Sequence, residues 1–163
     1  MRVLFAVAIG LVVGAALIVP AHAEIARFKD NPDSPILLGA TVKPGATLTF
    51  MSGQVPPVID RQAPADSPKA YGDTKTQTIG VLNRIRVALE GQGLGLGDVV
   101  KMTVFLVGDP ATGGKMDFKG FSEGHAQFFG TGGQPNVVAR STMQVSALVN
   151  PGWLVEIEVI AAK

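Results

Sequence analysis

The chain of 163 residues contains no cysteine, only one tyrosine and one tryptophan, and only two histidines, His22 and His125. The absence of cysteine excludes disulfide bonds, thiol nucleophiles and metal sites with thiolate ligands. So few histidines do not make up the ligand set of a zinc site. Neither a dinucleotide-binding glycine pattern ahead of a helix nor a phosphate-binding loop motif occurs. We therefore expect no metal and no cofactor.

The balance of charge argues against nucleic acid as a partner. The chain has 14 basic and 13 acidic residues, and Arg2 is the only charged residue before position 24, so residues 24–163 are formally neutral. Binding to phosphate backbones requires a concentrated basic surface, and no basic run or basic patch with interleaved aromatics is present. The chain is also too apolar to be disordered.

The only long apolar run lies at the amino terminus. It covers residues 3–19, follows Arg2, and is followed by a small-x-small sequence, Ala-His-Ala, at residues 21–23. This combination is typical of a cleaved signal peptide. A membrane anchor is the alternative, since a helix needs about 17–25 apolar residues to span a bilayer. The cleavage pattern favours a signal peptide at residues 1–23, and a periplasmic or secreted protein without stable membrane insertion.

The remaining residues, 24–163, have the length of one domain and the pattern of an α+β fold. Residues 36–42 and 47–52 are predicted to form a hairpin, because Lys-Pro-Gly between them favours a turn. Helices are predicted from residue 73 or 74 to about 90 and at about 116–129. Further strands are predicted at residues 98–107, 140–148 and 153–161. The order ββ-α-β-α-ββ predicts two helices on one face of a mixed sheet.

Five fragments, in order, resemble the RidA/YjgF family. They are SGQVP, TQT, DVVKMTVFL, ARSTMQV and VEIEVIA, at residues 52–56, 76–78, 98–106, 139–145 and 155–161. The resemblance extends over residues 34–162. It implies a chorismate-mutase-like fold of the bacillus type, in a homotrimer whose sheets form a central barrel with ligand sites in the clefts between subunits. Enzymatic members of the family deaminate 2-imino acids, such as 2-iminobutanoate and 2-iminopropanoate, to 2-keto acids and ammonia.

The resemblance also implies roles for individual residues. Arg140 matches the arginine that holds the substrate carboxylate, and a guanidinium binds a carboxylate through two parallel hydrogen bonds. The alternative is that Arg140 pairs with Glu156 or Glu158 on a neighbouring strand. Glu156 matches the candidate general base, although both glutamates could be structural. Thr142, two residues after the arginine, could orient water or the imine nitrogen, or could simply favour the strand.

Other positions are predicted to line the substrate cleft. Ser52 and Gly53 match a loop of small residues that lines the cleft; the alternative interpretation is an ordinary turn after a strand. Ser122 stands where an asparagine is common in the family's second helix. The amino-terminal tyrosine of the family's enzymes is absent, because residues 34–37 read Ser-Pro-Ile-Leu. His125 is interpreted as a satisfied interface residue rather than a ligand.

Three functions follow as hypotheses. The first is deamination of 2-imino or enamine acids, with a small carboxylate as substrate. The second is a non-catalytic, exported trimer that binds small carboxylates or metabolites; the missing tyrosine and the predicted export favour it. The third is a purely structural or partner-binding trimer. Ribonuclease activity, which has been attached to some relatives, is disfavoured by the neutral charge and the lack of a basic patch.

Overall fold

The computed structural model describes residues 24–163. The predicted signal peptide, residues 1–23, lies outside the described residues. Within residues 24–163, no helix has the length and apolar character that a membrane crossing requires.

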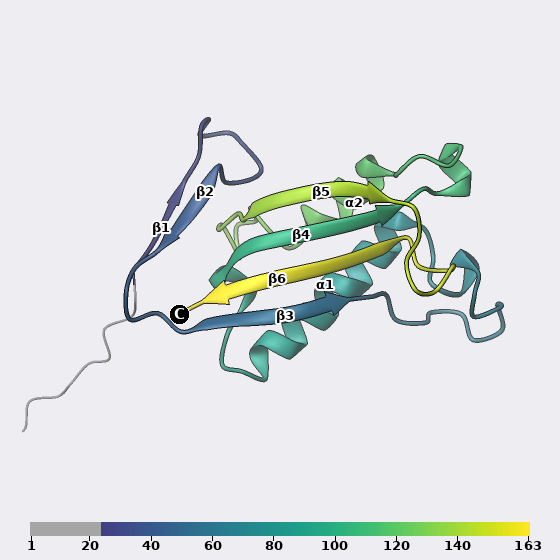
Figure 1. Ribbon diagram of the computed structural model, residues 1–163, viewed down its shortest axis with the longest axis horizontal. Coiled ribbons are helices and arrows are strands. Elements are labelled where there is room, and N and C mark those ends of the chain that lie inside the picture. The colour runs from purple at the N-terminus through teal and green to yellow at the C-terminus, as the bar shows by residue number, and fades with distance from the viewer. Residues whose placement is uncertain (1–23) are drawn as a thin grey trace, which may run out of the picture.

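A four-stranded mixed sheet forms the centre of the fold (Figure 1). Its strand order is β3 (Leu48–Gln54), β6 (Val155–Ala162), β4 (Val99–Val107) and β5 (Ala139–Val145). β6 runs antiparallel to both β3 and β4, whereas β4 and β5 are parallel. The last two strands of the chain are therefore separated in the sheet by β4.

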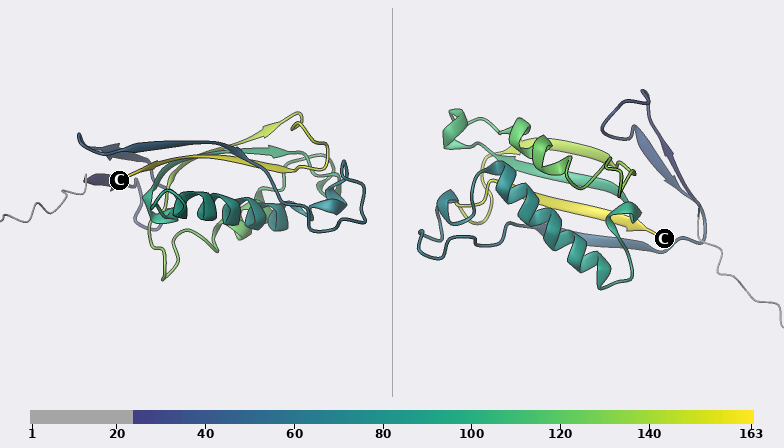
Figure 2. Two further views of the ribbon diagram at one scale, coloured as in Figure 1. Left: turned by 90° about the horizontal axis from the view of Figure 1, so that it is seen from below. Right: turned by 180° about the vertical axis from the view of Figure 1, so that it is seen from behind.

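Two helices, α1 (Thr74–Glu90) and α2 (Phe118–His125), lie on the same face of this sheet (Figure 2). Short 3-10 turns are found at Pro68–Ala70, Leu96–Asp98 and Pro110–Thr112. The core lies between the helices and the sheet, and its largest fully buried side chains include Leu82, Ile85, Leu89, Met102, Leu106, Phe121 and Ile157. The opposite face of the sheet has no covering layer within residues 24–163. The predicted α+β architecture is confirmed.

The amino-terminal strands pair differently from the prediction. β1 (Ile25–Phe28), a strand that was not predicted, pairs antiparallel with β2 (Gly39–Val42). The predicted hairpin of residues 36–42 with 47–52 is therefore wrong. β3 pairs instead with the carboxyl-terminal strand, where Thr47 and Lys163 exchange both backbone hydrogen bonds at 2.7 and 3.1 Å. The long, alternating β6 offers β3 a longer ladder than four-residue β2 can, although its register shifts between Met51 and Gln54.

The second helix is shorter than the predicted span of residues 116–129. The side chain of Asp117 accepts a hydrogen bond from the backbone N–H of Gly120 at 2.8 Å, so the helix begins at Phe118. After His125 the backbone tightens, since the N–H of Gln127 donates to the carbonyl of Gly124 at 3.3 Å. Residues 126–129, which include Phe128 and Phe129, therefore lie beyond the end of the helix.

A buried glutamine joins α1 to the start of β6. The side chain of Gln77 is fully buried, and its amide nitrogen donates to the carbonyls of Gly72 and Gly152 at 2.9 and 3.0 Å. Its amide oxygen accepts from the N–H of Leu154 at 2.7 Å. All three bonds are made with backbone groups, two of them 75 and 77 residues away in sequence. Gln77 therefore holds the loop before β6 in place.

Replacing Gln77 with leucine is expected to lower the free energy of unfolding by roughly 2–4 kcal/mol, because buried backbone groups would lose their partners. Chemical denaturation monitored by circular dichroism measures this loss. The exposed Gln92→Leu variant is the matched control and should change stability by less than about 0.5 kcal/mol. A Gln77→Leu protein as stable as this control would contradict the role.

Candidate functional site

Arg140 and Thr142 project from β5 toward the helices. In the parallel pairing of β4 with β5, Arg140 lies opposite Met102 and Thr142 opposite Val104. Paired residues share a face of the sheet, and both Met102 and Val104 are fully buried under the helices. The prediction that Thr142 shares the face of Arg140 is confirmed.

Glu156 and Glu158 project from the other face of the sheet. They lie opposite Phe105 and Thr103 in the pairing of β4 with β6. They alternate along β6 with buried valine and isoleucine side chains of the core, so their carboxylates point to the uncovered face. The two glutamates share one face, as predicted, but within one subunit this face is not the face of Arg140.

The alternative interpretation, in which Arg140 pairs with Glu156 or Glu158, is therefore wrong for a single subunit. β4 separates β5 from β6, and the side chains point to opposite faces. The four ion pairs formed among residues 24–163 involve other residues. Within the described chain, the charge of Arg140 has no acidic partner.

Ser52 and Gly53 lie with the glutamates on the uncovered face. Ser52 and Glu158 line the same shallow pocket, with a volume of about 300 Å³. A methyl group added at Gly53 would overlap the Glu156 carboxylate, which therefore lies directly against the backbone of β3. The pairing of β3 with β6 is irregular at this point, between Met51 and Gln54. Two predicted site residues, Gly53 and Glu156, are thus brought together, and Ser52 shares a pocket with Glu158.

A second pocket, with a volume of about 410 Å³, contains Arg140 on its wall. Ser122 and His125 of α2 line it as well, together with Lys29, Asp33 and Pro35 from the segment between β1 and β2. The end of this segment is held beside β5, because the N–H of Leu37 donates to the carbonyl of Val138 at 3.0 Å. The stretch that lacks the family's tyrosine therefore borders the Arg140 pocket.

The guanidinium of Arg140 packs on the aromatic side chains of α2. Its central carbon lies 4.9 Å from the ring centre of Phe121 and 6.0 Å from that of Phe118. Burial lowers the pKa of Arg140 from its ordinary value. A guanidinium nevertheless remains charged at any physiological pH. The pocket therefore presents a half-buried positive charge without a counter-ion among residues 24–163, which suits an anionic ligand.

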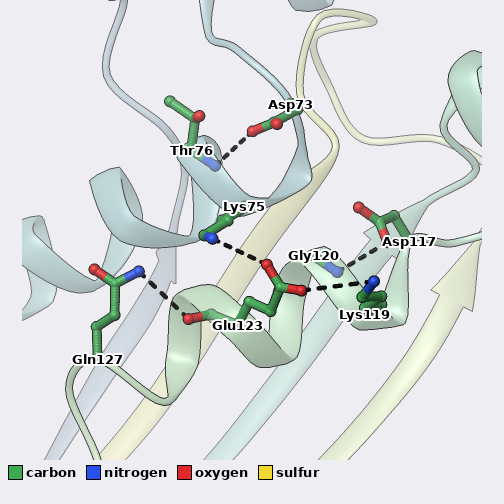
Figure 3. Close-up of polar contacts among 8 residues, drawn as sticks. All are labelled: Asp73, Lys75, Thr76, Asp117, Lys119, Gly120, Glu123 and Gln127. Atoms are coloured by element: carbon green, nitrogen blue, oxygen red, sulfur yellow. Dashed lines mark hydrogen bonds and ion pairs between the residues drawn. The ribbon is translucent and has the colours of Figure 1, made fainter.

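Contacts between the helices fix the position of the pocket wall (Figure 3). Glu123 of α2 binds Lys75 of α1 at 2.9 Å and Lys119 at 3.9 Å. A methyl group added at Gly124 would lie 3.0 Å from the side chain of Thr78, so the helices approach closely there. Exposed ion pairs contribute little stability, so the close approach at Gly124 is the stronger restraint. These contacts hold Ser122 and His125 beside Arg140.

His125 lines the Arg140 pocket, a position that the sequence did not predict. It is only 4% exposed, yet its Nε2 atom has no hydrogen-bond partner among residues 24–163. The hydroxyl of Thr142, on the same face of the sheet as Arg140, also lacks one. Burial and the charge of Arg140 lower the pKa of His125 to about 3. Within residues 24–163 nothing satisfies Nε2, so the prediction that His125 is a satisfied interface residue stays a prediction about the assembled protein. Its position three residues after Ser122 places both on one side of the helix.

Residues 24–163 contain no group of three or more histidine or acidic side chains arranged to hold a metal ion.

Comparison with known proteins identifies the family. The sequence model described as Endoribonuclease L-PSP matches residues 39–163. A RutC family protein from Pyrococcus horikoshii is 35% identical over 136 residues, which cover 83% of this chain and 95% of the relative. The structure of E. coli TdcF with bound serine is 30% identical, covers 80% of this chain and 89% of TdcF, and has a TM-score of 0.56.

The structure of the E. coli YjgF gene product is 28% identical, with a TM-score of 0.55 and coverage of 80% of this chain and 90% of its own. Its fold has the same two helices on a mixed sheet. The match of the family model over most of the chain agrees with the five sequence fragments and with the fold. This chain belongs to the RidA/YjgF family.

Proposed function

We propose that this protein hydrolyses 2-imino or enamine acids to 2-keto acids and ammonia, in clefts between the subunits of a homotrimer. One observation carries the proposal: Arg140 is a half-buried cation on the wall of a pocket of about 410 Å³, without an acidic partner among residues 24–163. A buried charge needs a partner, and a small carboxylate supplies one with the geometry that a guanidinium prefers.

The proposed reaction requires mainly positioning. Arg140 holds the substrate carboxylate, and a water molecule adds to C2, which is the iminium carbon. Glu156 accepts a proton from this water as the C2–O bond forms and the C=N π bond becomes a lone pair on nitrogen. It passes that proton to the nitrogen, the C–N bond breaks to release ammonia, and Glu156 takes the remaining hydroxyl proton as the C2 oxygen becomes the keto group. A protonated imine is already electrophilic, so orientation and mild base assistance are sufficient. The bound serine of E. coli TdcF, a 2-amino acid, supports a ligand of this class.

The placement of Glu156 supports an assembly in which two subunits share each site. Because Arg140 and Glu156 project from opposite faces of one sheet, they can meet only if a neighbouring subunit supplies one of them. The uncovered face carries large exposed hydrophobic side chains, Phe50 at 71% and Leu48 at 46% exposure. Apolar surface of this kind is typical of faces that are buried in oligomers.

A second function, binding of small carboxylates without turnover, is favoured by the composition of the pocket. Within one subunit, Ser34 and Pro35 stand where the family's enzymes have a tyrosine, and Glu156 is absent from the wall. We also propose, from residues 1–23 of the sequence, that the protein is exported to the periplasm or secreted. Enzymes that produce imines are largely cytoplasmic, which adds weight to the binding function.

A coupled assay distinguishes the two functions. An amino-acid oxidase generates 2-iminopropanoate or 2-iminobutanoate in the assay mixture. The disappearance of the imine is then followed with and without the protein. We expect a rate above that of spontaneous hydrolysis. If the rate is unchanged but 2-oxobutanoate raises the melting temperature, the binding function replaces deamination. If neither effect is seen, both proposals fail.

A further inference from the structure

His125 is a polar residue of the Arg140 pocket that the proposed reaction does not use. Its imidazole is buried between two aromatic rings, with ring centres 4.8 Å from Phe129 and 5.7 Å from Phe121. The stacking restrains the plane of the ring, but it leaves Nε2 without a hydrogen bond among residues 24–163. A buried polar atom without a partner costs free energy and requires an explanation in a folded protein. His125 also lines the pocket of Arg140, so a ligand there can supply the missing bond once the ring turns Nε2, which has almost no accessible surface, toward the cavity.

The protonation state of His125 defines what this ligand contact can be. Burial, and then the positive charge of Arg140, lower its pKa to about 3, so the imidazole is neutral at physiological pH. A neutral imidazole has one N–H donor and one acceptor nitrogen. It can therefore donate to a carbonyl oxygen, or accept from an imine or amine nitrogen, by exchange of tautomers.

Arg140 and His125 lie on the same aromatic support. The guanidinium carbon is 4.9 Å from the ring centre of Phe121, and the imidazole centre is 5.7 Å from the same point. Both side chains line one pocket, together with the hydroxyl-bearing Ser122. A ligand whose carboxylate binds Arg140 therefore shares its pocket with the imidazole.

We infer that His125 is a specificity-determining residue, which hydrogen-bonds the oxygen or nitrogen on the carbon next to the bound carboxylate. The pocket thereby selects 2-oxo, 2-imino and 2-amino acids over carboxylates that have only hydrogen at that carbon. A site built to bond a polar group discriminates against ligands that lack the group, because its own polar atom then stays unpaired. The inference rests on the proposed binding of carboxylates by Arg140, but not on turnover.

The test compares two ligands that differ only at this carbon. The dissociation constants of 2-oxobutanoate and butanoate are measured by calorimetry or by ligand-observed NMR. The wild-type protein should bind 2-oxobutanoate roughly 10-fold more tightly, as expected for one added hydrogen bond in a shielded site. His125→Phe keeps the aromatic stack without the nitrogens, and should bind both ligands with the affinity that the wild type has for butanoate. His125→Gln restores a donor and an acceptor, and should recover part of the preference.

Each outcome decides between the inference and the proposed function. If His125→Phe keeps the 10-fold preference, or if it weakens the binding of both ligands equally, His125 has a packing role only and the inference is overturned. Unchanged butanoate affinity shows at the same time that the pocket of the variant is folded. If the wild type binds neither ligand, the proposed role of Arg140 fails and the inference falls with it. If Arg140→Met loses both ligands while His125→Phe loses only the preference, both stand.

Discussion

Replacing Arg140 with methionine is expected to lower kcat/KM for imine hydrolysis by roughly 10²- to 10³-fold. Two hydrogen bonds from a guanidinium to a carboxylate contribute about 3–4 kcal/mol, and each 1.4 kcal/mol corresponds to a factor of ten. Methionine fills a similar volume and can still pack on the ring of Phe121. The substitution therefore removes the charge with little change in packing.

The stability of this variant separates the role of Arg140 in binding from a role in folding. Arg140 is half-buried without an acidic partner among residues 24–163, so its charge does not stabilise the fold. We expect Arg140→Met to melt at the wild-type temperature or above it. Arg140→Lys keeps a positive charge but cannot make two parallel hydrogen bonds to the carboxylate, and should have intermediate activity. Wild-type kcat/KM in Arg140→Met would rule out the proposed mechanism.

Mixed trimers of two inactive variants are expected to regain activity. Arg140→Met and Glu156→Gln subunits are each inactive alone, but a cleft with Arg140 from one and Glu156 from the other is intact. If the two chains assemble at random in equal amounts, about one quarter of all clefts receive both native residues, and in cyclic trimers that contain both chains about one cleft in three does. Co-expression with two different affinity tags, followed by tandem purification, yields the mixed assemblies for assay.

The same experiment tests the assembly itself. Sedimentation of the wild-type protein should show a trimer, since the uncovered sheet face with Phe50 and Leu48 would otherwise remain in water. Mixed assemblies that sediment as trimers but stay inactive would mean that Arg140 and Glu156 do not form a shared site. A monomer that hydrolyses imines at the full rate would also contradict the shared cleft, because a single subunit would then be enough for turnover.

Local patterns predicted the central elements of the fold well. The bounds of α1 agree with the prediction because Asp73 caps the helix through the N–H of Thr76 and the apolar side chains recur at helical spacing. β4 was also predicted, from its run of β-branched and apolar residues. β1 was missed because four residues are too few for a reliable period, and its partner is distant in sequence.

The sequence predicted which site residues share a face of one strand, but not how the strands are arranged in the sheet. Alternation placed Arg140 with Thr142 and Glu156 with Glu158, since side chains two apart share a face. Whether these two pairs face each other depends on the order and direction of β4, β5 and β6, which no local pattern contains. The missing partner of His125 could not be foreseen either, because it depends on the packing of α2 against the sheet.

If two subunits share each cleft, as proposed, the separation of Arg140 and Glu156 by the sheet would make activity depend on protein concentration. A single subunit already holds the Arg140 pocket, so capture of a carboxylate would be independent of protein concentration. Turnover in a shared cleft would instead vanish as trimers dissociate, with the affinity between subunits setting the threshold. One chain could thus act as a carrier when scarce and as an enzyme when abundant.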